Sequence, residues 1–329
     1  MIGRRQFITL IGGAAAAWPL AARAQQPTMP VIGYLEAGSP EPSANLVAAF
    51  RKGLSEAGYI EGRNVAVEFR WAHNENERLS DLAADLVRRR VDVIVTPVST
   101  LAAFAAKAAT TTIPIVFGTG ADPVKAGLVT SLNRPGGNIT GANTMSTELL
   151  PKRLSLLNEL LPSSSRFAVL VNPDNPFGTD PTYAEVRVGA AAIAQKLEVF
   201  TAKSNAEIDS AFAALVQKGA NAVVFSPDAL FDSRRVQLAT LAARYQLPAL
   251  HWKREFTEAG GLMSYGSNVA EVIRQTGIYA GRILKGEKPG DLPVLLPTKF
   301  DLVINSQTAK IFGIEIPSTL LAHADEVIE

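Results

Sequence analysis

The sequence predicts an α/β protein made of two doubly wound lobes with parallel sheets. Short apolar runs typical of buried strands alternate along the chain with segments in which apolar residues recur at helical spacing. This alternation occurs twice, and a dense cluster of turn-forming residues at 133–138 separates the two series. A length of 329 residues suits two lobes that each bury their own core.

The first series predicts a parallel sheet with helices on both faces. An apolar run at 31–35 is the first expected strand, and Leu46, Phe50 and Leu54 then continue at helical spacing up to Gly58. The elements expected after these are a strand at 64–71, a helix at 79–87, a strand at 91–95, a helix at 101–109 and a strand at 113–117.

The second series repeats the same order of elements. It predicts strands at 166–171, 197–201, 222–226 and 248–251, and helices at 184–196, 208–218 and 235–245. A helix at 270–285 follows, and a Pro- and Gly-rich passage then leads to a strand at 300–304. Because the chain is expected to cross between lobes here, each lobe should be discontinuous. Lobe 1 would comprise 30–145 and about 268–295, and lobe 2 would comprise 146–267 and about 296–329.

The composition excludes several classes of site. The chain has no Cys, which removes disulfides, Cys-based metal sites, Cys nucleophiles and a lipidated N-terminal Cys. With 32 Lys and Arg against 31 Asp and Glu, the net charge of +1 gives no indication of a nucleic-acid-binding surface. The histidines His73, His251 and His323 lack the spacing of metal ligands, so no metal and no other cofactor is expected.

Residues 1–24 are typical of a cleavable export signal. Arg4 and Arg5 precede a mild apolar stretch, and Ala-Arg-Ala at 22–24 has the small-residue pattern that signal peptidase accepts. The arginine pair favours the twin-arginine route, with general secretion as the alternative. The apolar stretch is interrupted by glycines and is shorter than the roughly 20 residues of a membrane span. Losing the three arginines of this segment would leave 29 basic against 31 acidic residues. Because the segment is typical of a cleavable export signal and is too short to span a membrane, we expect a periplasmic protein with no membrane insertion once matured.

Candidate ligand-binding residues follow the expected strands, because ligands of parallel sheets bind beyond the carboxyl ends of the strands. Ser99 and Thr100 stand at a helix start, where they would cap the helix or bind a ligand carboxylate. Glu36, Asp122 and Asp228 would accept a ligand ammonium or act as turn and cap residues. Aromatic residues near strand ends would enclose an apolar ligand group or pack in the core. The full candidate set is Leu35, Glu36, Ser39, Pro97, Ser99, Thr100, Gly118, Thr119, Asp122, Asn143, Asn172, Asn175, Phe177, Asp228, Trp252 and Tyr265.

Enzyme signatures are scarce in the sequence. It contains no Gly-x-x-x-x-Gly-Lys-Ser/Thr phosphate loop and no Gly-x-Ser-x-Gly nucleophile elbow. The Gly-Thr-Gly segment at 118–120 lacks the third glycine of a dinucleotide fingerprint. We therefore expect a solute-binding protein and not an enzyme, with an exported two-lobed enzyme as the alternative from a different class.

Several motifs resemble those of one protein family. The most specific is Pro-Gly-Gly-Asn-Ile-Thr-Gly at 135–141. The chain from about Pro30 to its end resembles the ABC transporter substrate-binding proteins, the family that includes the tryptophan/tyrosine-type binding proteins. The other segments that carry the resemblance are Ile-Gly-Tyr-Leu at 32–35, Phe-Arg-Lys-Gly-Leu at 50–54, Gly-Tyr-Ile-Glu-Gly-Arg-Asn at 58–64, Ile-Pro-Ile-Val-Phe at 113–117, Asp-Pro-Val at 122–124 and Gly-Gly-Leu-Met-Ser-Tyr-Gly at 260–266.

The resemblance implies a type I periplasmic-binding-protein fold, with a hinge of three crossovers and a small solute held in the cleft between the lobes. Ser99 and Thr100 match the family's helix start after the third strand, and the loops at 118–122 and 172–175 match its cleft loops. An amino acid, aromatic or other, is the candidate solute, and another small solute is the alternative. The implied partners are an ABC permease and its ATPase, with the chain itself a monomer. A ligand-sensing receptor of the same fold is the alternative role.

Overall fold

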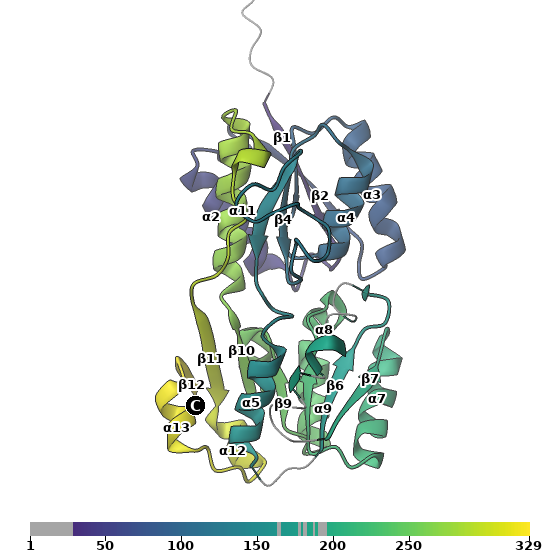
Figure 1. Ribbon diagram of the computed structural model, residues 1–329, viewed down its shortest axis with the longest axis vertical. Helices are drawn as coiled ribbons and strands as arrows, with labels where there is room; N and C mark the ends of the chain where they lie inside the picture. The colour runs from purple at the N-terminus through teal and green to yellow at the C-terminus, as the bar shows by residue number, and fades with distance from the viewer. Residues whose placement is uncertain (1–28, 163–165, 177–178, 180–182, 187, 190–195) are drawn as a thin grey trace, which may run out of the picture.

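The computed structural model describes residues 29–162, 166–176, 179, 183–186, 188–189 and 196–329. The expected export signal and most of the helix expected at 184–196 lie outside the described residues. Within the described part, two lobes are stacked along the long axis of the molecule, each built on its own sheet with helices on both faces (Figure 1). The predicted α/β class with two lobes is confirmed.

The first lobe contains a parallel five-stranded sheet in the order β2-β1-β3-β4-β5. The strands are β1 Val31–Glu36, β2 Ala66–Trp71, β3 Val93–Thr96, β4 Ile115–Thr119 and β5 Ile139–Asn143. Sequence reasoning did not anticipate β5, because its sequence Ile-Thr-Gly-Ala-Asn is not a continuous apolar run. Gly141 is required in β5, since a Cβ there would lie 2.0 Å from the carbonyl oxygen of Phe117 in β4.

Helices pack on both faces of this sheet. On one face, α2 (Ala44–Glu56) and α11 (Val269–Leu284) bury Phe50 and Ile273 in one apolar cluster. On the other face, α3 (Leu79–Arg88) and α4 (Thr100–Ala109) form a second cluster, preceded by the short helix η1 (Asn76–Arg78). The chain therefore returns to the first lobe through α11 after building most of the second lobe (Figure 1).

The second lobe contains a seven-stranded sheet in the order β12-β11-β10-β9-β8-β6-β7. One pair departs from the parallel pattern, because β11 runs antiparallel to β10. The chain leaves this lobe through β10 and re-enters it through β11, so these two strands must run in opposite directions. The strands are β6 Arg166–Val171, β7 Lys196–Thr201, β8 Ala222–Phe225, β9 Ala249–His251, β10 Met263–Ser267, β11 Phe300–Asn305 and β12 Glu326–Ile328.

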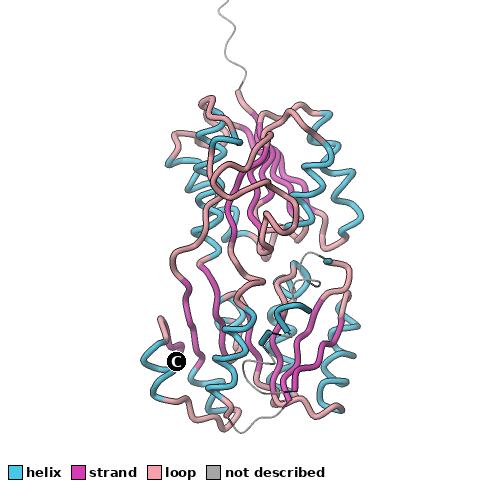
Figure 2. The backbone as a smooth tube through the Cα atoms, viewed as in Figure 1, coloured by secondary structure: helices cyan, strands magenta, loops and turns pink. Residues whose placement is uncertain are grey.

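Helices lie on both faces of the sheet of the second lobe (Figure 2). Each face carries its own apolar cluster. Leu154 and Leu157 of α5 pack with Leu320 of α13 on one face. Phe212 of α7 and Leu238 of α9 pack on the other. The helices are α5 Leu150–Leu160, α7 Asn205–Gln217, α8 Ala229–Ser233, α9 Arg235–Arg244, α10 Arg254–Glu258, α12 Ser306–Ile311 and α13 Ser318–His323, and η2 Pro289–Asp291 lies before the last crossing.

The chain passes between the lobes three times, after β5, after β10 and after α11. Hydrogen bonds join these crossings, since Ser267 Oγ donates to the Thr144 carbonyl oxygen at 3.0 Å. The fully buried Arg153 of α5 donates from Nε to the Tyr265 carbonyl at 2.8 Å and from Nη1 to the Ser146 carbonyl at 2.6 Å. One guanidinium thereby holds the first two crossings against the second lobe.

Candidate functional site

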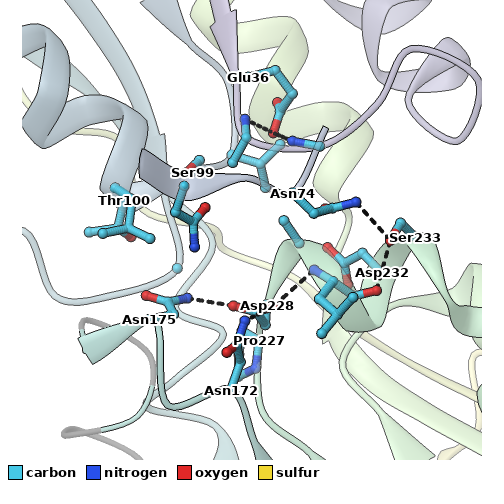
Figure 3. Close-up of a pocket in the computed structure, with 18 of the residues that line it drawn as sticks. Glu36, Asn74, Ser99, Thr100, Asn172, Asn175, Pro227, Asp228, Asp232 and Ser233 are labelled. Atoms are coloured by element: carbon cyan, nitrogen blue, oxygen red, sulfur yellow. Dashed lines mark hydrogen bonds between the residues drawn. The ribbon is translucent and has the colours of Figure 1, made fainter. Parts of the chain in front are cut away.

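A cavity of about 770 Å³ lies between the two lobes. The first lobe lines it with the carboxyl end of β1, the loop after β2 and the N-terminus of α4. The second lobe lines it with the segments that follow β6, β8 and β9. Both sheets therefore present the carboxyl ends of parallel strands to one space, which is where open α/β sheets bind ligands (Figure 3).

The N-terminus of α4 forms one side of the cavity. Ser99 caps this helix, because its Oγ accepts a hydrogen bond from the Ala102 N–H at 3.1 Å. The Thr100 and Thr119 hydroxyl oxygens lie 2.6 Å apart. Thr119 itself is fully buried. Thr119 Oγ1 also accepts from the Ala121 N–H at 3.1 Å, so it fixes the Thr100 side chain in place. The first backbone N–H groups of a helix attract anions, which makes this side suited to a ligand carboxylate.

Asp228 lies on the second-lobe side and is already occupied by protein donors. Its Oδ1 accepts from Asn172 Nδ2 at 3.0 Å and from the Leu230 N–H at 2.9 Å, and its Oδ2 accepts from Asn175 Nδ2 at 2.8 Å. Burial raises the pKa of Asp228, whereas the two asparagine hydrogen bonds lower it in part. Asp228 thus organises the loop after β6 and caps α8.

A largely buried ion pair joins α8 to the segment after β9, with the side chains of Lys253 and Asp232 10% and 17% exposed. Lys253 Nζ lies 2.7 Å from Asp232 Oδ2 and 4.6 Å from the centre of the Trp252 ring. Burial lowers the pKa of Lys253, but Asp232 and Glu255 outweigh that effect and hold the pKa above its usual value. Burial raises the pKa of Asp232 to about 6 despite Lys253. Lys253 is therefore charged, and it covers one face of Trp252.

His251 is buried beneath this ion pair and is neutral. Its Nδ1 accepts a hydrogen bond from the Lys253 N–H at 3.0 Å, so the ring proton resides on Nε2. Burial, the largest effect, and the neighbouring Lys253 lower its pKa well below the usual value. The distance from Nε2 to Asp232 Oδ1 is 3.7 Å, which is longer than a hydrogen bond.

Glu36 ends β1 on the first-lobe side and is 4% exposed. Its Oε1 accepts from the Ala37 N–H at 3.1 Å and from the Gly38 N–H at 3.4 Å, while Oε2 is buried with no hydrogen-bond partner. Burial raises the pKa of Glu36 to about 7, and the charge of Lys253 opposes this increase. A carboxyl group with this pKa is partly protonated at neutral pH.

The structure brings eight of the sequence-predicted candidates to the cavity wall. These are Glu36, Ser39, Ser99, Thr100, Asn172, Asn175, Asp228 and Trp252. Trp252 offers no free ring face, because it is 3% exposed, packs in the apolar cluster of β1 and α2, and lies under Lys253. Phe177 lies outside the described residues.

Seven candidates are not among the residues that line the cavity: Leu35, Pro97, Gly118, Thr119, Asp122, Asn143 and Tyr265. Leu35 lies on the face of its sheet that α3 and α4 cover, and it packs in their apolar cluster. Asp122 accepts from the Val124 and Lys125 N–H groups, which makes it a turn residue. Asn143 Oδ1 accepts from the Met145 N–H at 2.7 Å in the first crossing.

The other candidates away from the cavity also have structural contacts. A Cβ on Gly118 would lie 1.7 Å from the Pro97 carbonyl oxygen, so this pair lets β4 approach the loop before α4. The Tyr265 ring packs 6.2 Å from the ring of Phe300. These residues therefore make packing contacts near the crossing region and the strand ends, away from the cavity.

Sequence reasoning missed Asn74, Asp232 and Ser233, which all line the cavity. Asn74 stands in a loop with a left-handed backbone (φ 66°), and its Nδ2 lies 3.4 Å from Ser233 Oγ across the cavity. Asp232 and Ser233 belong to the five-residue helix α8, which has no clear periodic signal. The four-residue spacing of Asp228 and Asp232 was the available signal, since it places both on one helix face.

The sequence profile of the ABC transporter substrate binding protein family matches residues 40–328. The chain belongs to this family. It is therefore a substrate-binding protein of an ABC transporter, and such proteins bind a small solute and work with a membrane transporter. A tyrosine-binding protein from Clostridioides difficile (strain R20291) is 28% identical over 265 residues, which cover 79% of this chain and 74% of that protein. The family that the motifs predicted is confirmed.

Solved structures of relatives show the same fold. A conserved domain protein from Vibrio cholerae has a TM-score of 0.83 at 28% identity, covering 91% of this chain and 99% of that one. An ABC domain from Streptococcus pneumoniae in complex with L-Trp has a TM-score of 0.82 at 25% identity, with the same coverage. A ligand-free, open substrate-binding protein with adhesive properties from Clostridium difficile has a TM-score of 0.65 at 26% identity, again with 91% and 99% coverage.

The chain superimposes better on the ligand-bound relative than on the ligand-free, open one. The L-Trp complex and the open structure have nearly equal identity and equal coverage, yet their TM-scores are 0.82 and 0.65. The hydrogen bond between Asn74 and Ser233 joins the two lobes across the cavity in this structure.

Two further properties concern the part of the chain that the structure describes. No group of three or more His, Cys, Asp or Glu side chains there is placed to hold a metal ion. None of the helices in that part of the chain combines the length and apolar character needed to cross a bilayer.

Proposed function

We propose that this chain is an exported receptor that captures an amino acid in the cavity between its lobes. The observation that carries the proposal is the distribution of polar groups around one cavity, with the N-terminus of α4 on one side and buried carboxyl groups from both lobes elsewhere. An α-amino acid carries one anionic and one cationic group, which match these two kinds of partner.

The size of the cavity supports an amino acid, including an aromatic one. Ligand pockets usually measure about 300–1,000 Å³, and this cavity of about 770 Å³ is within that range. Two relatives support the same class of solute, since one is named a tyrosine-binding protein and another was solved with L-Trp. Their solutes make tyrosine and tryptophan the first compounds to test.

The mechanism that we propose is capture by closure of the two lobes. A solute that contacts both walls of the cavity binds the closed arrangement more tightly than the open one, and this difference in affinity shifts the population toward closure. The closed form would then dock on an ABC permease and deliver the solute to it, with the cognate ATPase driving uptake. We propose that the chain does this as a monomer and without chemical turnover of the solute.

We also propose that the protein works in the periplasm after export. The Arg4-Arg5 pair and the Ala-Arg-Ala sequence at 22–24 support a cleaved signal of the twin-arginine type. N-terminal sequencing of the protein from the periplasmic fraction of a Gram-negative host checks this. A mature N-terminus at Gln25 is the expected result, and retention of Met1 would contradict it.

The test of solute capture is a thermal-shift screen of the refolded, ligand-free protein against the twenty L-amino acids and a set of aromatic acids. A true ligand at a hundredfold excess over its Kd stabilises the folded state by about 2.7 kcal/mol. Calorimetric titration then measures the Kd, and chromatography of the mixture shows whether the ligand is recovered unchanged. If no amino acid shifts the melting temperature, the proposal is wrong. Conversion of the ligand would instead indicate an enzyme.

A further inference from the structure

Two carboxyl oxygens beside the cavity are buried and have no hydrogen-bond partner. They are Glu36 Oε2 from the first lobe and Asp232 Oδ1 from the second. Buried carboxyl oxygens are almost always paired, because an unpaired one loses its hydration without compensation. Asp228 shows the usual arrangement, since both of its oxygens accept hydrogen bonds from the protein. Asp232 Oδ1 lies 3.7 Å from His251 Nε2, which is beyond hydrogen-bond distance, and Glu36 Oε2 has no partner, so both oxygens can accept from a donor outside the chain.

The charges around the cavity are also unbalanced. Eight acidic side chains line it against three basic ones, those of Lys203, Arg235 and Lys253. Among these groups Glu36, Asp228 and Lys253 are buried, and the Asp232 side chain is 17% exposed. His251 adds no charge, because its Nδ1 accepts a hydrogen bond and its pKa is lowered by burial. Burial without enough positive charge explains why the pKa values of Glu36 and Asp232 are raised. A cationic group in the cavity would supply what is missing.

The two carboxyl groups come from different lobes. Glu36 follows β1, and Asp232 lies in α8 next to Ser233, which hydrogen-bonds to Asn74 of the first lobe. Figure 3 shows Ser99 and Thr100 on the opposite side of the drawn site from Asp232 and Ser233. A ligand with its anionic end at the α4 N-terminus would thus have its cationic end between the two carboxyl groups.

We propose that Glu36 and Asp232 together bind the ammonium group of the solute, and that this paired site, and not Asp228, selects ligands with a primary amine. The inference rests on the proposed capture of an amino acid and deepens it by assigning the cationic subsite. An ammonium group has three N–H donors, so one ammonium has enough donors for a carboxyl oxygen from each lobe. Contact with both lobes makes the amine a direct cause of closure.

The test compares matched ligands that differ only at the two ends. The probes are L-tryptophan, tryptamine and indole-3-propionate, with L-tyrosine, tyramine and 3-(4-hydroxyphenyl)propionate as a second series. Calorimetric titrations use the refolded wild-type protein and the Glu36→Gln variant. Glutamine keeps the oxygen that accepts from Ala37 and Gly38, so this variant is expected to fold. Asp232→Asn is the second variant, and Glu77→Gln is the matched control because it removes an exposed carboxylate at the edge of the same cavity.

The expected result is that Glu36→Gln weakens binding of the amino acid and the amine at least tenfold and changes binding of the deaminated acid less than twofold. Asp232→Asn should act in the same direction, and Glu77→Gln should have little effect on any probe. Equal losses for all three ligand types, or no loss, would overturn the ammonium site while leaving amino-acid capture intact. Binding of tryptamine or tyramine that depends on Glu36, without binding of any of the twenty amino acids in the thermal-shift screen, would support the site and overturn amino-acid capture. If another amino acid is the ligand found by the screen, it and its decarboxylated and deaminated analogues replace these probes, and failure of the amine-bearing members to depend on Glu36 shows that the ammonium site is wrong.

Discussion

Asn74 of the first lobe and Ser233 of the second lobe meet across the cavity, with Asn74 Nδ2 3.4 Å from Ser233 Oγ. Both partners are held by their own lobes. The Asn74 N–H donates to the Ala37 carbonyl at 2.7 Å, and Ser233 Oγ donates to the Leu230 carbonyl at 2.8 Å. Because each side chain is anchored to a different sheet, this contact can form only when the lobes are closed.

Replacing Asn74 with alanine should therefore weaken solute binding. The closed state would lose one neutral hydrogen bond, which is worth about 0.5–1.5 kcal/mol, so the Kd should rise roughly twofold to tenfold. The open state lacks the contact, so the variant should also shift the ligand-free protein toward openness, which small-angle X-ray scattering can measure as a larger radius of gyration. Asn45→Ala is the control, since Asn45 is exposed at the edge of the same cavity. Equal effects of both substitutions would contradict a closing role for Asn74.

Ser99 combines two roles that substitution can separate. It caps α4, and replacing an N-cap serine with alanine costs about 0.5–2 kcal/mol of stability. Aspartate is an equally good cap, so Ser99→Asp should retain the unfolding free energy to within about 0.5 kcal/mol. The same aspartate would repel a ligand carboxylate at the α4 N-terminus, so the affinity for the amino acid should fall at least tenfold. Calorimetry and urea denaturation measure the two effects, and an unchanged affinity in Ser99→Asp would place the carboxylate elsewhere.

The raised pKa of Glu36 has a consequence for stability in the absence of ligand. The folded state binds the proton of this carboxyl more tightly than the unfolded state, where the pKa is near 4.5, and the folded pKa is about 7. The unfolding free energy contributed by Glu36 should therefore decrease as the pH rises from about 4.5 to about 7, by about 3 kcal/mol at most. Lys253 and Asp232 are the charged groups that act on Glu36 and partly oppose each other.

Urea denaturation of ligand-free protein at pH 5 and pH 8 checks this sign. Glu36→Gln should be more stable than the wild type at pH 8 and similar to it at pH 5, because glutamine has no charge to bury. The affinity of the wild type for an ammonium-bearing ligand should increase over the same pH interval, since ionised Glu36 is the form that attracts the cation. A variant that is less stable than the wild type at pH 8 would show that burial of the charge is compensated within the protein.

Much of the fold could be predicted because parallel sheets leave a strong signal. β1 and β6 are buried on both faces of their sheets, so their sequences are nearly continuous apolar runs. The observed bounds of these two strands differ from the predicted bounds by at most one residue. β5 could not be recognised in this way, since Thr140, Gly141 and Asn143 interrupt the apolar pattern. Gly141 is present because of a close approach to Phe117, and such a tertiary contact leaves no trace in local periodicity.

Some residues of the candidate site could be predicted from topology, and others depend on tertiary contacts. Glu36, Ser99 and Asp228 directly follow strands, so topology alone predicts that they face a common edge of the sheets. Asp232 and Lys253 become partners only because the short helix α8 lies beside the end of β9, and their ion pair has no sequence signature. Asn74 reaches the second lobe from a left-handed loop conformation that its sequence permits but does not require.

The close packing of α11 on α2, by which the chain returns to the first lobe, depends on two glycines. Replacing either glycine should strongly destabilise the protein. A Cβ on Gly53 of α2 would lie 1.8 Å from the Arg274 carbonyl oxygen, and one on Gly277 of α11 would lie 2.3 Å from the Phe50 carbonyl oxygen. Alanine normally stabilises a helix by about 1 kcal/mol relative to glycine, but here the two helix backbones would have to separate. We expect Gly53→Ala and Gly277→Ala each to lower the unfolding free energy by about 3 kcal/mol or more, measured by urea denaturation. Ser55→Ala on the exposed face of α2 is the control and should change stability by less than about 0.5 kcal/mol. A neutral or stabilising effect of Gly53→Ala would mean that α2 and α11 do not cross at this short distance, and that the first lobe is not closed by the returning helix.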